Sequence, residues 1–344
     1  MNEGNFYLVP VEDRQAPSVP PIFEYARLHG AWEEHPGGSD ADPSALVQDA
    51  GLNWHVTRHP VYTSSSDTLT GLGDVLAQGY KALVREDTGT VLGVVTSDYA
   101  PIQNQAAART VTLLAQRAAR SWGLEGDHEP RLAAAAPYGR DRSRGVYVVD
   151  LGLSGGRSFL IARNGHGDGS AFAIDYVEID DAGTVVPIDA PGAGSVKIRE
   201  GHLGRIRDRL ARRSSSVFAE GWGERLVNVL VDWAYTEDWP ASRRTHEALV
   251  AHLWPGDQST NPRPYGAAVH PREHLLVALE GAGTLGLAYR TICHYIDHDS
   301  EARERGDATK DRLERLAAGA GTRIKERALA WLTSQVAPEP DDMP

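Results

Sequence analysis

The sequence has a single cysteine, Cys293, among its 344 residues. One thiol cannot form an internal disulfide or a thiolate-rich zinc module, and sparse cysteine suits a reducing compartment. The sequence also has no apolar run of 18 residues, and its first residues lack the basic and apolar regions of a signal peptide. These absences predict a cytoplasmic protein with no membrane partner.

Motifs of the common nucleotide-dependent and hydrolytic enzymes are also missing. No Gly-x-x-x-x-Gly-Lys-Ser/Thr loop occurs, which argues against a nucleotide-driven motor. Residues 152–156 read Gly-Leu-Ser-Gly-Gly and satisfy Gly-x-Ser-x-Gly, but the apolar run at 158–163 predicts a strand next, where a hydrolase requires a helix. An ordinary hairpin turn is the better interpretation, and we expect no enzymatic activity and no cofactor.

A metal-dependent nuclease is the strongest enzymatic alternative. Glu178, Asp180 and Asp181 carry carboxylates that can hold magnesium, although a strand end before a glycine more often forms an acidic turn. His294 and His298 have the i, i+4 spacing of helical zinc ligands. The sequence offers neither the Glu of His-Glu-x-x-His nor an obvious third ligand, so we predict no metal site.

Positive charge is scarce overall and concentrated in one segment. The formal net charge is −12, and an acidic surface is repelled by phosphates, so any contact with nucleic acid must be local. Between residues 197 and 213, seven basic residues stand against two acidic ones, a local net charge of +5. We call residues 197–213 the basic segment.

The spacing of leucine and isoleucine predicts a helix from about residue 202 to 218, and Arg205, Arg209 and Arg212 lie well round from its apolar face. Forked guanidinium groups at the margin of a sheet can contact successive phosphates. The residues predicted to bind nucleic acid are Lys197, Arg199, Arg205, Arg209, Arg212 and Arg213. The alternative is that these charges form an ordinary solvated helix face.

The middle of the chain is rich in predicted strands. Residues 145–152, 158–163 and 171–179 are three β-rich runs joined by glycine-containing turns, which predicts an antiparallel meander. Upstream, residues 80–95 have the pattern of a hairpin, and residues 104–122 have the apolar stripe of a helix.

Nearly every segment after residue 202 is predicted to be helical. The helices are expected at residues 202–218, 222–235, 242–253, 272–279, 284–298 and 310–336. The predicted fold class is therefore α+β: a central antiparallel β-sheet with a β-β-β-α core, covered by helices, and a helical C-terminal half. We divide the chain into a loose N-terminal extension over residues 1–45, an α+β domain over 46–336 that is sheet-rich to about residue 200, and a disordered tail over 337–344.

Four sequence blocks in a fixed order resemble a known family. Residues 50–56 read Ala-Gly-Leu-Asn-Trp-His-Val, and residues 99–104 read Tyr-Ala-Pro-Ile-Gln-Asn after a glycine-broken apolar strand. Residues 164–170 read Asn-Gly-His-Gly-Asp-Gly-Ser, and Gly-Thr at 283–284 precedes Asp-His at 297–298. Together these blocks resemble the phage/plasmid-like proteins grouped as domain of unknown function 932, over most of the chain.

The residues that carry this resemblance, which we call the signature residues, are Tyr99, Gln103, Asn104, Asn164, His166, Asp168, Asp297 and His298. The family carries no settled chemistry. The resemblance implies a prophage or plasmid origin, with replication, recombination or plasmid maintenance as the setting. The chain departs from the family because it lacks a Cys-Asn-Thr-Leu motif after the third strand.

Each signature block also has a structural interpretation. Asn104 is expected to cap the helix that follows it rather than to contact a ligand. The glycine-rich stretch around His166 and Asp168 suits a tight hairpin with a hydrogen-bonded turn, more than a phosphate cradle or a metal site. Asp297 and His298, near a helix end, are expected to form a structural pair or a cap.

The functional hypothesis rests on the sheet followed by the basic segment. This order also resembles, in layout only, the core of ring-forming single-strand annealing proteins. We therefore predict that the protein binds single-stranded DNA and anneals it during recombination or replication of a mobile element. We expect it to act as a homo-oligomer, because basic stripes repeated on several copies raise the effective concentration and so the affinity for DNA. The alternative is a non-enzymatic protein-interaction or regulatory factor of such an element.

Overall fold

The computed structural model describes residues 26, 30–32, 43–63, 75–122, 129–139, 142–153, 158–166, 171–180, 183–188, 198–201, 233, 235–254, 271–299 and 320–336. These residues belong to two compact units. The sheet unit is drawn from Phe23–Tyr176 and Val196–Glu224, and the helical unit from Val177–Ser195 and Arg225–Pro344. The fold of each unit follows from its own sequence pattern.

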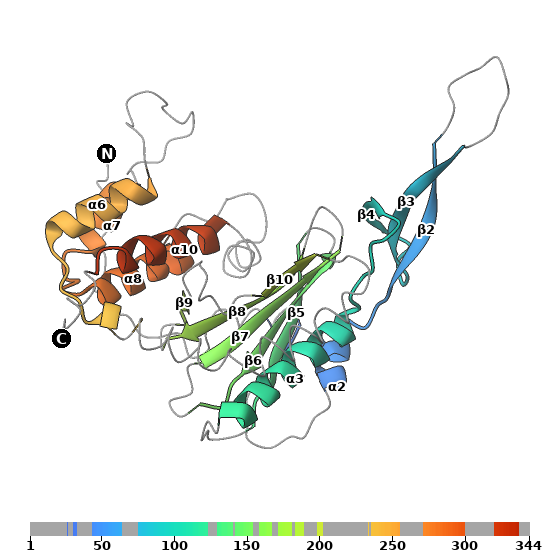
Figure 1. The fold of residues 1–344 in the computed structure, drawn as a ribbon, viewed down its shortest axis with the longest axis horizontal. Coiled ribbons are helices and arrows are strands. Elements are labelled where there is room, and N and C mark those ends of the chain that lie inside the picture. The colour runs from blue at the N-terminus through green and yellow to red at the C-terminus, as the bar shows by residue number, and fades with distance from the viewer. Residues whose placement is uncertain are drawn as a thin grey trace, which may run out of the picture. The chain divides into compact units, whose positions relative to one another are not determined.

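The main sheet of the sheet unit is antiparallel, with the strand order β1-β5-β6-β7-β8-β10 (Figure 1). Its strands are β1 (Ala31–Trp32), β5 (Arg131–Tyr138), β6 (Arg144–Asp150), β7 (Ser158–Gly165), β8 (Ala171–Ile179) and β10 (Ile198–Gly201). Every residue of β5, β6 and β7 after the first is buried. Both faces of these strands are therefore shielded, as their continuous apolar runs require.

Among the helices that the structure describes, two pack on these strands. They are α2 (Pro43–Asp49), which contacts β5, and α3 (Asn104–Trp122), which contacts β5, β6 and β7 (Figure 1). The buried residues of α3 recur every three or four positions at Ala107, Val111 and Leu114, so one stripe faces the strands. The predicted range of this helix is confirmed at both ends.

A second sheet, which we call the ribbon, consists of β2 (Val56–Thr63), β3 (Val75–Arg85) and β4 (Val91–Thr96) in that order. Gly89 has a φ of +68°, which closes the predicted hairpin between β3 and β4. Leu83 is the one buried residue of β3. Unlike the main sheet, the ribbon is largely exposed.

The helical unit consists of short helices around one apolar core. They are α6 (Arg243–Leu253), α7 (Pro271–Ala278), α8 (Leu285–His294), which continues into the π-turn η4 (Tyr295–Asp299), and α10 (Ala320–Thr333). Strand β9 (Val185–Pro187) pairs with the last residues of β8, Val177–Ile179. Helix α10 packs against α6, α8 and β9, with Leu329 and Leu332 fully buried.

The predicted mixed α+β class, with antiparallel sheets and helices in the C-terminal half, is confirmed. The meander of β6, β7 and β8 is confirmed as well. Strands that were not predicted include β1, within the expected loose extension, and β5, β9 and β10. The predicted helix at 202–218, most of the extension and the tail at 337–344 lie outside the described residues.

Two turn predictions are also confirmed. Gly152 has a φ of +68° and strand β7 follows at Ser158, so the Gly-x-Ser-x-Gly pattern does not open a helix. Asp180 accepts a hydrogen bond from Thr184 N at 2.8 Å, as an acidic turn requires. In the part of the chain that the structure describes, no helix combines the length and apolarity needed to cross a membrane.

Candidate functional site

The structure locates only the beginning of the basic segment. Arg199 lies in β10, where its Cα pairs with that of Ala173 of β8. Strand β10 is at one end of the strand order of the main sheet. Lys197, Arg205, Arg209, Arg212 and Arg213 lie outside the described residues, so the chain enters the rest of the basic segment from an edge strand.

Three signature residues of the sheet unit form one buried group, which we call the amide cluster: Asn104, Asn164 and His166. Asn164, at the end of β7, is fully buried. Its Nδ2 donates to Ile102 O at 2.9 Å and to Asn104 Oδ1 at 3.1 Å, and lies 3.3 Å from His166 Nε2. The end of β7 is therefore fastened to the start of α3.

Asn104 does not cap α3, so that prediction is wrong. Its Oδ1 instead accepts from Asn164 and from the hydroxyl of Tyr147 on β6, at 3.0 Å from the latter. Burial raises the pKa of Tyr147 well above its usual range, so the phenol keeps its proton and donates it. A Cβ at Gly145 would lie 2.5 Å from the Tyr147 hydroxyl, which explains the glycine on the same face.

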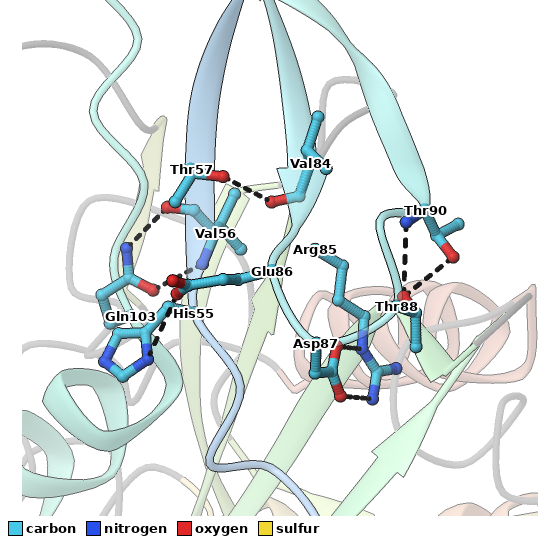
Figure 2. Close-up of polar contacts among 10 residues, drawn as sticks. All are labelled: His55, Val56, Thr57, Val84, Arg85, Glu86, Asp87, Thr88, Thr90 and Gln103. Carbon is cyan, nitrogen blue, oxygen red and sulfur yellow. Dashed lines mark hydrogen bonds and ion pairs between the residues drawn. The ribbon is translucent and has the colours of Figure 1, made fainter.

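The carboxamide of Gln103 pairs with the backbone of β2 (Figure 2). Nε2 donates to Val56 O at 3.0 Å, and Oε1 accepts from Val56 N at 2.9 Å. Gln103 thus supplies the two bonds that a neighbouring strand residue would supply. Tyr99 is also buried, and its carbonyl oxygen accepts from Arg58 Nη1 of β2 at 3.1 Å. These signature residues join the ribbon to the start of α3.

Trp54 extends the amide cluster towards the ribbon. Its ring meets that of His166 edge to face, with centroids 5.6 Å apart, and the guanidinium carbon of Arg85 lies 4.6 Å from the Trp54 ring centroid. Arg85 also binds both carboxylate oxygens of Asp87, at 2.7 and 2.8 Å, and this hydrogen bonding lowers the pKa of Asp87 (Figure 2). The turn after β3 is thereby held against the base of the ribbon.

Three buried polar atoms of the amide cluster have no hydrogen-bond partner among the described residues. They are Asn104 Nδ2, Asn164 Oδ1 and Trp54 Nε1. Buried amide atoms normally bind protein groups or ordered water. Asp168, which follows β7 in the sequence, lies outside the described residues.

The other two signature residues lie in the helical unit. Asp297, in η4, forms a buried ion pair with Lys325 of α10, whose Nζ is 2.6 Å from each carboxylate oxygen. Lys325 Nζ also donates to Val185 O at 2.6 Å, and Val185 N donates to Asp297 Oδ2 at 2.9 Å. Burial raises the pKa of Asp297 to about 6, although the Lys325 charge opposes the rise.

His298 belongs to a neighbouring pair of imidazoles. The rings of His294 and His298 are 4.4 Å apart between centroids, as the predicted i, i+4 spacing requires. Thr184 Oγ1 lies 3.2 Å from His294 Nδ1 and 3.4 Å from His298 Nε2. Over the described ranges, no three His, Cys, Asp or Glu side chains are grouped as a metal ion would need.

The carboxylates considered for a nuclease are used in other contacts. Glu178 accepts from Arg290 Nη2 at 2.8 Å, and the same guanidinium donates to Glu237 at 2.9 Å. Asp180 forms the turn before Thr184, and Asp181 lies outside the described residues.

Burial raises the pKa of Cys293 to about 12, so this thiol remains protonated.

No protein-family model, no curated protein and no solved structure matches this chain. The resemblance to the phage/plasmid-like family therefore stays a prediction. What the structure adds is that each unit has a buried polar group containing signature residues: Asn104, Asn164 and His166 in the sheet unit, and Asp297 in the helical unit.

Tyr147 and Lys325 were not predicted from the sequence to take part in these groups. Tyr147 lies in an apolar strand, where a tyrosine predicts packing and not an amide partner. Lys325 had a detectable signal, because it occupies the same helical stripe as Thr322, Leu329 and Leu332, all of which are buried. A lysine within an apolar stripe requires a buried acidic partner.

Proposed function

We propose that the protein binds single-stranded DNA through the basic segment and anneals strands as a homo-oligomer. One observation carries the proposal: a segment with a net charge of +5, in a chain whose net charge is −12, begins in the edge strand of the main sheet. Arginines that follow a sheet edge can contact consecutive phosphates of a flexible strand.

The chemistry of the described residues supports a binding role over a catalytic one. Glu178 and Glu237 both form ion pairs with the same guanidinium, that of Arg290. Asp297 is paired with Lys325, and its Oδ2 also accepts from the backbone of β9. Phosphate binding by arginine requires no activated nucleophile, and a sequence-independent electrostatic contact suits an annealing protein. The resemblance to phage/plasmid-like proteins supports recombination or replication as the setting.

The first test exchanges charge in the basic segment. Arg205, Arg209 and Arg212 are changed together to Glu, and binding to a labelled single-stranded oligonucleotide is measured by gel shift at low salt. The matched control changes Arg243, Arg244 and Arg323 to Glu, because these exposed side chains of α6 and α10 give the same change in net charge. We expect the first variant to lose binding and the control to keep it.

A salt titration sharpens this test. When the same three arginines are changed to Gln, three phosphate contacts are lost, and the slope of log K against log salt should become shallower by about 2. Equal binding by the wild type and the basic-segment variants, or equal loss in the control, would reject the proposal. Cleavage of the oligonucleotide that stops with a chelator would instead support the nuclease.

A further inference from the structure

The two faces of the ribbon differ in chemistry. Residues that are directly opposite in antiparallel pairs lie on the same face. The register pairs Ala82 with Val94, Val84 with Val91, and Tyr80 with Thr96, so these side chains share one face. Thr57 and His59 of β2 lie on the same face, opposite Val84 and Ala82. This face, which we call the apolar face, carries no Asp, Glu, Lys or Arg in the paired strands.

The apolar face is exposed. Tyr80 is 52%, Val94 57% and Val91 61% accessible. The opposite face carries the buried Leu83 and Arg58, whose guanidinium donates to carbonyl groups of Ser97 and Tyr99. Arg58 thus anchors the opposite face to the segment after β4, whereas the apolar face is uncharged and exposed.

The two edges of the ribbon also differ. On the β2 edge, Arg58, His59 and Pro60 are consecutive, and charge and proline both discourage pairing with another strand. The β4 edge reads Val-Leu-Gly-Val-Val-Thr, without charge or proline. Among the described elements, β4 pairs only with β3. The β2 edge of the ribbon thus carries charge and proline, whereas β4, whose pairing with β3 shifts register between Leu83 and Val84, carries neither.

We propose that β4 pairs antiparallel with β4 of a second copy of this chain, which joins two ribbons into one continuous sheet. Antiparallel pairing about a two-fold axis places a strand against itself, so β4 needs no partner of different sequence. A register with Val94 opposite the Val94 of the second copy keeps both apolar faces on the same side.

Charge favours a second copy over nucleic acid at this surface. The three ribbon strands and the turn after β3 carry Arg58, Lys81 and Arg85 against Glu86 and Asp87, a net charge of +1, whereas the whole chain carries −12. Two copies can approach here without the repulsion that the rest of the chain would impose. A phosphate backbone would meet no Lys or Arg side chain on the apolar face. This pairing does not depend on DNA binding by the basic segment.

The test is whether the protein self-associates, and whether a charge introduced on the β4 edge weakens that self-association. Molar mass is measured by light scattering across a dilution series of the full chain. Val94→Lys places like charges opposite each other at the pairing axis, and we expect it to raise the dimer Kd by about tenfold or more. The matched control is Val277→Lys, because Val277 on α7 is 54% accessible and outside the ribbon. The control should keep the wild-type Kd.

Two single-cysteine variants keep the proposal testable if Val94→Lys fails to fold. The one natural thiol, Cys293, is buried, so Val94→Cys introduces an accessible one. We expect Val94→Cys to be captured as a covalent dimer by a short bismaleimide, and Val277→Cys to remain monomeric. A wild-type chain that stays monomeric at every concentration, or a Val94→Lys variant that dimerises like the wild type, overturns the proposal. If the wild type is monomeric, the β4 edge remains available for pairing with a different protein.

Discussion

The two groups of signature residues both connect elements that are distant in sequence, but one does so with neutral hydrogen bonds and the other with an ion pair. In the sheet unit, the amide cluster joins β6, β7 and α3 through neutral amides and a phenol. In the helical unit, Asp297 and Lys325 join η4, α10 and β9 through full charges. Each group fastens elements that are distant in sequence, and both are almost completely buried.

The difference between them lies in what happens when one partner is removed. A neutral amide that loses a partner leaves an unsatisfied dipole, whereas a buried carboxylate that loses its lysine leaves an uncompensated charge. The charged group should therefore be the more sensitive of the two, and its stability should depend on pH through its carboxylate.

The largest effect is expected from Lys325→Met. This variant leaves Asp297 buried without its cation, and we expect a loss of about 3–5 kcal/mol in the free energy of unfolding. Hydrogen exchange read by mass spectrometry should show faster exchange in peptides from α8 to α10. The double variant Lys325→Met with Asp297→Leu should recover most of the loss, because it removes both charges. A double variant as unstable as the single one would contradict this account.

The deficit of Lys325→Met should depend on pH. The pKa of Asp297 in the folded wild type is about 6, above its unfolded value of roughly 3.9, so folding takes up a proton between these values and stability falls as pH rises through 6. Without Lys325, which lowers this pKa, the folded pKa rises further. The variant should therefore recover relative to the wild type as pH falls from 8 to 5. A deficit that is constant over this range would exclude the buried charge as its cause.

A smaller effect is expected in the amide cluster. Asn164→Ala removes the donor to Ile102 O and one of the two donors to Asn104 Oδ1. We expect a loss of about 2 kcal/mol, because one buried carbonyl is left without its partner. The control is Asn53→Ala, an exposed asparagine of the same unit, which should change stability by less than about 0.5 kcal/mol. A loss as large as that of Lys325→Met would remove the contrast between the two groups.

The sequence predicted individual helices and strands better than it predicted which strands pair and which side chains contact one another. Helix α3 was predicted at its full length because Pro101 precedes it and its apolar stripe is regular. Strand β5 was missed because its four consecutive alanines favour helix and show no alternation, and it becomes a strand by pairing with β6. Its conformation is therefore set by the sheet and not by its own residues.

The candidate sites show the same limit. Periodicity placed Asn104 at the start of a helix and so suggested a cap, but it could not reveal Tyr147 and Asn164, which lie 43 and 60 residues away. Asp297 and Lys325 are 28 residues apart and lie on separate elements. Sequence spacing predicts which face a side chain occupies, whereas its partner depends on how the elements pack.

The smallest effect is expected at Gln103, on the boundary between the amide cluster and the ribbon. Gln103→Met keeps the length of the side chain but removes both hydrogen bonds to Val56, which are only partly buried, so water can replace them. We expect a loss of about 1 kcal/mol and faster hydrogen exchange confined to the start of β2. Gln78→Met, at an exposed glutamine of β3, is the control and should leave exchange unchanged. Faster exchange throughout β6 and β7 would show instead that Gln103 supports the main sheet, and that the ribbon is not held separately by this one carboxamide.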